Sequence, residues 1–170
     1  MKNKSVKLLT SAAMFAALTL ALTYFHTPMP NANGGYVHLG DAVIFLAASI
    51  LPLPYACAAA AVGGAMADPL SGFAVWAPAT LIIKALLAVC FTSKQETILC
   101  KRNYFAAIGT FIFTIGGYYL AEGIIYGNFT APAASIVGNL TQWLGSWIVY
   151  LLVAVSLDKA GFKKSITKNM

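Results

Sequence analysis

The sequence predicts an all-α integral membrane protein, with six transmembrane helices and with both termini in the cytoplasm. Composition predicts the class, because 59% of the 170 residues are hydrophobic and only 9% are charged, whereas soluble domains carry about 25% charged residues. A soluble fold of this length would leave too much apolar surface in water. The length indicates one domain, residues 1–170.

The positions of the basic residues predict the topology. Of the eleven Lys and Arg residues, all but Lys84 fall in the N-terminal segment, in the loop at 92–103 or in the tail: Lys2, Lys4, Lys7, Lys94, Lys101, Arg102, Lys159, Lys163, Lys164 and Lys168. Six helices place these three segments on one side of the membrane, whereas five or seven would separate them. Basic loops favour the cytoplasmic side, so the pattern indicates membrane orientation and not nucleic-acid binding.

Turn-forming residues separate the six apolar segments. The segment HTPMPNANGGY at 26–36 ends the first segment, because prolines and glycines favour loops. Pro52 and Pro54 indicate a tight turn after the second. ADPLSG, TSKQETILCKRN and GNFTAP separate the remaining segments. The expected helices therefore cover 6–25, 39–51, 55–67, 73–91, 104–126 and 133–157.

The polar residues of these segments gather in the outer half of the predicted bundle. Asp41 begins the second helix and Asp68 ends the third, both at the outer face and with His38 beside them, while Glu122 and Asn139 lie near the outer ends of the last two helices. Structural alternatives exist. Asp41 can interact with a helix dipole, Asp68 can cap a turn, and His38 can be a loop residue at the membrane edge.

Lys84 lies inside the fourth apolar segment. A lysine near the middle of a transmembrane helix costs about 2.5–3.5 kcal/mol, so it requires a partner or a hydrated cavity. Trp76, Thr80 and Lys84 recur every four residues and share one helix face. The alternative to a ligand-binding role is a structural ion pair between Lys84 and Glu122.

The fifth and sixth segments carry two similar stripes, which comprise Tyr119, Glu122 and Tyr126 with Tyr118 beside them, and Asn139, Gln142, Trp143 and Ser146. An interfacial aromatic belt or hydrogen bonds between helices are the structural alternatives. Together the three stripes predict a pocket that is open to the outside and suited to a small heteroaromatic ligand. The candidate binding residues are His38, Asp41, Trp76, Thr80, Lys84, Tyr119, Glu122, Asn139 and Trp143.

The first segment contains SAAMFAAL, in which small residues recur every four positions as Ala12 with Ala16 and Ala13 with Ala17. Such pairs allow helices to approach closely. The motif predicts either packing inside the protein or a docking face for another membrane protein.

The stretches VHLGDAVIFLAA and GGAMADPLSGFAVWAPATLIIK carry a resemblance to the S components of energy-coupling factor (ECF) vitamin transporters, in the group that includes riboflavin, hydroxymethylpyrimidine and vitamin B6 proteins. The resemblance covers nearly the whole chain, and the alanine pairs look like the family's docking motif. It implies a prokaryotic plasma-membrane subunit with a vitamin pocket near the outer face. It also implies partners, namely a transmembrane coupling subunit and two ATPases. LPLPYA departs from the Gly-Pro turn that related chains often have.

The expected function is capture of a pyridoxine- or hydroxymethylpyrimidine-like ligand, with riboflavin or thiamine as alternatives. A ligand-free assembly subunit and a stand-alone transporter are rival interpretations. An enzyme is disfavoured because the chain has two His and no H-x-x-x-H arrangement. The three cysteines lack paired spacing, so no metal and no cofactor are expected.

Overall fold

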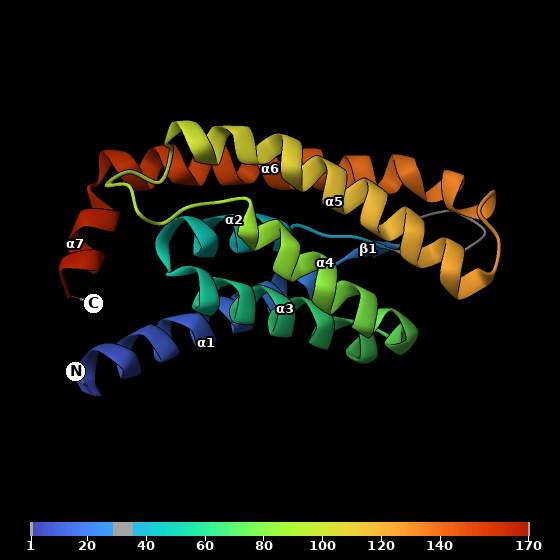
Figure 1. Ribbon diagram of the computed structural model, residues 1–170, viewed down its shortest axis with the longest axis horizontal. Coiled ribbons are helices and arrows are strands. Elements are labelled where there is room, and N and C mark those ends of the chain that lie inside the picture. The colour runs from blue at the N-terminus through green and yellow to red at the C-terminus, as the bar shows by residue number, and fades with distance from the viewer. Residues whose placement is uncertain (1, 29–35, 170) are drawn as a thin grey trace.

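The computed structural model is an elongated helical bundle with both chain termini at one end (Figure 1). It describes residues 2–28 and 36–169. In chain order the elements are α1 (Lys2–Tyr24), β1 (Thr27–Pro28), β2 (Tyr36–Val37), α2 (Gly40–Ile50), α3 (Leu53–Leu70), the 3-10 turn η1 (Ala74–Trp76), α4 (Ala77–Val89), α5 (Lys101–Tyr126), the 3-10 turn η2 (Ala131–Ser135), α6 (Ile136–Lys159) and α7 (Phe162–Asn169).

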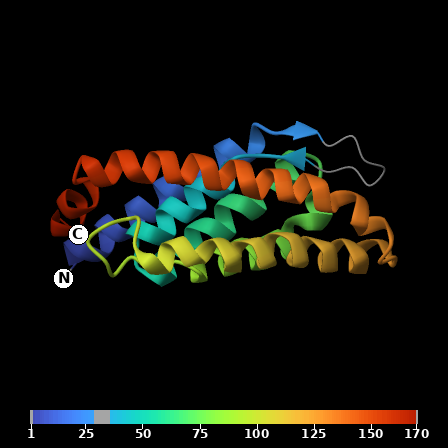
Figure 2. The same ribbon diagram turned by 90° about the horizontal axis from the view of Figure 1, so that it is seen from above.

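The long helices α5 and α6 run side by side along the bundle, and the shorter helices pack next to them (Figures 1 and 2). Helix α3 packs against both α1 and α4, and α2 contacts α1, α3, α4 and α6. This central position explains why almost every residue of α2 is buried.

Small residues on α3 allow its neighbours to approach closely. A Cβ atom at Gly63 would lie 2.5 Å from the Ala16 carbonyl oxygen of α1, and one at Gly64 would lie 2.7 Å from Cγ of Lys84 on α4. Glycine at both positions therefore sets the α1–α3 contact and leaves room for the aliphatic stem of Lys84. Dispersion forces at such close contacts hold membrane helices together.

An aromatic cluster fills the half of the bundle that lies nearer the termini. The Phe45 ring centroid lies 5.2 Å from that of Phe91 and 5.4 Å from that of Trp147, and Trp147 lies 5.1 Å from Tyr150. All four side chains are buried. The cluster thus joins α2, the residues that follow α4 and α6 in one packed core.

The predicted helical class is confirmed, with differences at the ends of elements. The fourth and sixth expected helices each begin with a short 3-10 turn, η1 and η2. The two ends of the expected loop at 26–36 pair as strands, Thr27 with Val37, just after the loop, and Pro28 with Tyr36. Residues 29–35 of that loop lie outside the described residues. Helix α7 was not expected, and Gly161 at φ 65° makes the turn that precedes it.

Three described helical stretches are long and apolar enough to cross a membrane: Lys4–Tyr24, Lys101–Tyr126 and Ala131–Lys159. Gly40–Ile50 and Ala74–Val89 are shorter apolar helices. The six-span count therefore stays a prediction. Large apolar side chains on α5 are nevertheless exposed, among them Phe105 at 71% and Ile124 at 74%, and a lipid environment accounts for such a surface.

Candidate functional site

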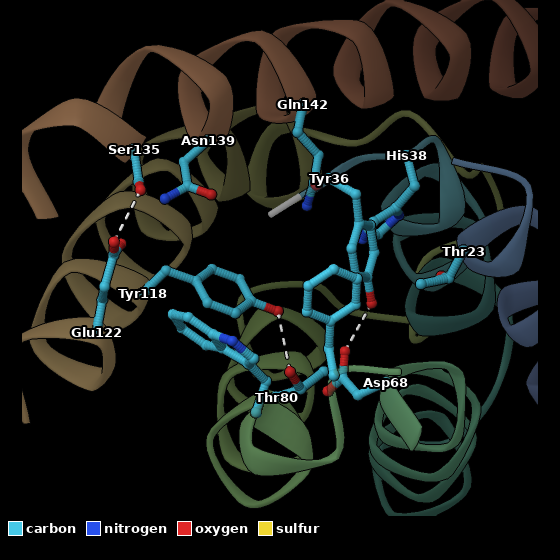
Figure 3. A pocket seen from close by; sticks show the side chains of 12 residues that line it. Thr23, Tyr36, His38, Asp68, Thr80, Tyr118, Glu122, Ser135, Asn139 and Gln142 are labelled. Carbon is cyan, nitrogen blue, oxygen red and sulfur yellow. Dashed lines mark hydrogen bonds between the residues drawn. The ribbon is translucent and has the colours of Figure 1, made fainter. Parts of the chain in front are cut away.

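A pocket lies among α3, α4, α5, α6 and strand β2 (Figure 3). It is a cavity of about 60 Å³. A buried water needs roughly 10–15 Å³ on this measure, so the space matches a few waters or one small substituted ring. The lining residues are Thr23, Tyr36, His38, Asp68, Phe73, Trp76, Thr80, Tyr118, Glu122, Ser135, Asn139 and Gln142.

Tyr36 of strand β2 forms one wall of the pocket together with its neighbours. The Tyr36 hydroxyl donates a hydrogen bond to Asp68 Oδ1 at 2.6 Å. The Tyr36 ring lies 4.1 Å from the His26 ring and 5.3 Å from the Phe73 ring, centroid to centroid. Burial is the main cause that raises the pKa of Tyr36 above its usual range, and Asp68 adds to it. The phenol therefore stays protonated and acts as a donor.

Helices α4 and α5 provide an aromatic wall. The Tyr118 hydroxyl donates to Thr80 Oγ1 at 3.5 Å. Trp76, at the end of η1, lies 6.3 Å from Tyr118 and 6.2 Å from Tyr126 between ring centroids. Trp76 and Thr80, which were expected to share one helix face, thus both line the pocket, although Trp76 lies in the 3-10 turn and not in α4 itself. A ring ligand would find flat apolar surfaces here.

A polar wall stands where α5 and α6 come together. Ser135 donates to Glu122 Oε1 at 3.0 Å, and Glu122 is 2% exposed. Ser135 is the last residue of η2, and Asn139, in the first turn of α6, also lines the pocket (Figure 3). Glu122 and Asp68 thus place two carboxyl groups in the lining.

A buried ion pair joins α2 to α4 next to the pocket. Lys84 Nζ lies 2.6 Å from Asp41 Oδ1, and both side chains are fully buried. Gln142 Nε2 donates to Asp41 Oδ2 at 2.9 Å. Neither Asp41 nor Lys84 lines the cavity. The alternative pair with Glu122 is not the one formed, since the Lys84 ammonium contacts Asp41 and lies 5.3 Å from the centroid of the Tyr118 ring.

Five of the nine candidate binding residues line the pocket together: His38, Trp76, Thr80, Glu122 and Asn139. Tyr119 and Trp143 point elsewhere. The Tyr119 hydroxyl donates to the Phe129 carbonyl at 2.6 Å, and Trp143 Nε1 donates to Thr110 Oγ1 at 3.1 Å. In both cases the preceding residue, Tyr118 or Gln142, lines the pocket instead.

Four lining residues were not singled out from the sequence: Thr23, Tyr36, Phe73 and Ser135. Tyr36 lies in the loop before the second expected helix and Phe73 is the first residue of the fourth, and helical spacing gives little information about where side chains at such positions lie. Thr23 and Ser135 are small hydroxyl residues of a kind that occurs throughout membrane helices. For these two the sequence contains no distinguishing feature.

His38 precedes α2 and is 6% exposed. Its Nδ1 accepts a hydrogen bond from the Gly40 backbone N–H at 3.0 Å, so that nitrogen carries no proton. Burial is the main cause that lowers the pKa of His38 to about 3, and the positive charge of Lys84 lowers it further, while Asp41 acts in the opposite direction. A neutral imidazole therefore borders the pocket.

The lowered pKa of His38 predicts that the folded protein loses stability in acid. The unfolded chain takes up a proton on His38 below the ordinary histidine pKa of 6.5, whereas the folded chain does so only near pH 3. The stabilisation is complete above pH 6.5 and is lost as the pH falls toward 3. Going from pH 7 to pH 5 should lower the free energy of unfolding by about 2 kcal/mol. Denaturant unfolding in detergent at both pH values measures it. The variant His38→Gln should lose that part of the pH dependence, and an unchanged dependence would contradict the assignment.

The alanine pairs on α1 lie on two different faces. Ala12 is buried and Ala16 is half-buried, whereas Ala13 and Ala17 are exposed. The first pair contributes to internal packing, with Ala16 next to Gly63 of α3. The second pair leaves a small-residue stripe on the outer surface. Both interpretations of SAAMFAAL thus have residues that fit them.

Within the described residues, no group of three His, Cys, Asp or Glu side chains is arranged to hold a metal ion. The family model "ECF-type riboflavin transporter, S component" matches residues 3–159. The chain is also similar to "Thiamine precursor transporter HmpT" of Lactococcus lactis subsp. cremoris, with 24% identity over 169 residues, which is 99% of this chain and 98% of that protein.

Proposed function

The chain belongs to the ECF-type riboflavin transporter S-component family, and from this premise we propose that it captures a hydroxymethylpyrimidine-like vitamin precursor at the outer face of the membrane. The family consists of transporter subunits and not of enzymes, and its members are multi-pass proteins of the plasma membrane that bind small vitamins and work with an ECF module. The substrate, the orientation and the composition of the module are the parts proposed here.

Pocket size carries the choice of substrate. A cavity of about 60 Å³, with the Trp76 and Tyr118 rings in its lining, suits a single substituted ring. The three fused rings of riboflavin, or both rings of thiamine, would require the walls to move apart. The relative described as a thiamine precursor transporter supports a pyrimidine, and pyridoxine is the nearest alternative of similar size.

The distribution of basic residues supports the proposed orientation of the chain in the membrane. One end of the bundle holds the N-terminus of α1, the loop at 92–100, the start of α5, and α7 (Figure 1). These segments, with the end of α6 beside them, contain all the basic residues except Lys84. By the positive-inside rule this end is cytoplasmic. The pocket then opens toward the outside, where an importer meets its substrate. Transfer inward would require a transmembrane coupling subunit and two ATPase subunits.

The lining also predicts which form of the vitamin binds. Among the described lining residues the charged side chains are Asp68 and Glu122, and none is Lys or Arg. A phosphate ester would therefore bring its negative charge next to two carboxyl groups without a cation. We expect the phosphorylated pyrimidine to bind at least about 100-fold more weakly than the free alcohol.

Calorimetric titration of the detergent-purified chain tests the proposal, with hydroxymethylpyrimidine, its phosphate, pyridoxine, thiamine and riboflavin compared side by side. Native mass spectrometry after growth on mixed vitamins identifies any ligand that is retained. Sub-micromolar binding of the free pyrimidine supports the proposal. Tight binding of riboflavin alone would contradict it, and no binding of any vitamin would favour the ligand-free assembly subunit.

A further inference from the structure

Asp68 has one satisfied and one unsatisfied carboxyl oxygen. Oδ1 accepts the short hydrogen bond from the Tyr36 hydroxyl. Oδ2 is buried and has no hydrogen-bond partner among the described residues, while the side chain is only 3% exposed and lines the pocket. A buried acceptor without a donor costs free energy, and native proteins contain few of them.

Two polar groups of α4 interact with the Asp68 carboxyl, and neither leaves Oδ2 with a hydrogen bond. The Thr80 hydroxyl accepts a hydrogen bond from Tyr118 and keeps its own hydrogen, which interacts with the Asp68 carboxyl, but this contact does not give Oδ2 a hydrogen bond of ordinary geometry. The Lys84 ammonium lies against Asp41 at 2.6 Å and does not line the cavity. Figure 3 shows Asp68 on the floor of the pocket below Tyr36, with its carboxyl group turned toward the cavity. The missing donor can therefore come from a ligand inside the pocket.

Tyr36 determines which kind of hydrogen-bonding group a ligand must present to Asp68. Because its phenol is the donor, the oxygen that faces it must accept, and the free oxygen beside it presents an acceptor to the ligand. A ring amine supplies N–H donors at such a place, whereas a ring carbonyl would put two acceptors face to face. A bond from a neutral amine to a charged acceptor is among the stronger ones in proteins.

We propose that Asp68 determines the specificity of the pocket by accepting an N–H from the exocyclic amine of an aminopyrimidine-type ligand. This assignment rests on the proposed function and adds to it the recognised group and the residue that recognises it. Tyr36 acts as the positioning residue, since it holds Asp68 through Oδ1 and leaves Oδ2 for the ligand.

The substitution Asp68→Asn tests the proposal through an exchange of preference. Tyr36 requires an acceptor, so the amide oxygen should take the Oδ1 position and the amide NH2 should take the position of Oδ2. The variant should bind the aminopyrimidine about 10- to 100-fold more weakly. It should bind the 4-oxo analogue, in which a carbonyl replaces the amine, more tightly than the wild type does. Calorimetric affinities for both compounds give the ratio.

Asp158→Asn is the matched control, because it makes the same change at an acceptor far from the pocket. The Asp158 carboxylate accepts the Ile98 and Leu99 backbone N–H groups at 2.7 and 2.9 Å. This variant should lose stability and keep the wild-type preference between the two compounds. A Tyr36→Phe variant should weaken aminopyrimidine binding without creating a preference for the oxo compound.

The outcomes separate this inference from the proposed function. If the wild type binds neither pyrimidine, the proposed function fails. If the wild type binds the aminopyrimidine and Asp68→Asn leaves the ratio of the two affinities unchanged, the function stands and the role of Asp68 is overturned. Equal losses for both compounds would likewise overturn it, because they would indicate a structural effect.

Discussion

Replacing Lys84 by methionine should lower the free energy of unfolding by about 3–5 kcal/mol, because the change leaves the Asp41 carboxylate buried without its cation. Both side chains are fully buried, and their atoms lie 2.6 Å apart. Gln142 would remain as the donor to Asp41, which is not enough to replace a charge. Denaturant or thermal unfolding in detergent, compared with the wild type, measures the loss.

A double substitution provides the control. In Asp41→Asn with Lys84→Met, the charge is removed from both partners and an acceptor for Gln142 is kept. This variant should recover about half or more of the lost stability, since a neutral replacement of a buried pair is often well tolerated. If the double variant were as unstable as the single one, unpaired charge would not be the cause.

The same experiment decides how Lys84 affects ligand binding. The sequence-based hypothesis makes Lys84 a ligand contact, and it predicts weaker binding by a variant that still folds. The structure puts Lys84 beside Tyr118, which lines the pocket, so any effect on affinity would pass through the shape of the wall. A stable Lys84→Met variant with reduced affinity would favour the direct contact.

The residues of the site differ in how far the sequence predicts them. Helix position and outer-half clustering are local properties, and they led to Trp76, Thr80, Glu122 and Asn139, which lie together in the pocket. The rotation of a helix about its axis depends on its neighbours, however. A shift of one residue turns a side chain by about 100°, which is why Tyr119 was expected where Tyr118 lies.

Partners distant in sequence were harder to predict. Lys84 pairs with Asp41 and not with Glu122 because α2 lies at the centre of the bundle and presents its first turn to α4. No periodicity within one segment contains that information. The Tyr36–Asp68 bond depends likewise on the β1–β2 pairing, in which two residues of each strand take part among those that the structure describes. These two contacts are the ones on which the site depends most.

Leucine at both Ala13 and Ala17 should abolish vitamin uptake by cells while leaving ligand affinity within about threefold of the wild type. Both alanines are exposed on α1, and the pocket is built from other elements apart from Thr23 near the end of that helix. Added side chains would fill the small-residue stripe and hold a docking helix away. Uptake assays with the full transporter, copurification of the coupling subunit, and calorimetry of the purified chain measure the three quantities.

The buried pair on the same helix is the matched control. Leucine at Ala12 and Ala16 adds the same volume where α1 packs into the bundle, and Ala16 already lies against Gly63 of α3. Overpacking should cost about 1–3 kcal/mol of unfolding free energy or more, and any loss of uptake would then follow from an unstable protein. The exposed pair should instead give a stable, ligand-binding chain that no longer assembles. Normal assembly and uptake with Ala13→Leu and Ala17→Leu would exclude this face of α1 as the docking surface.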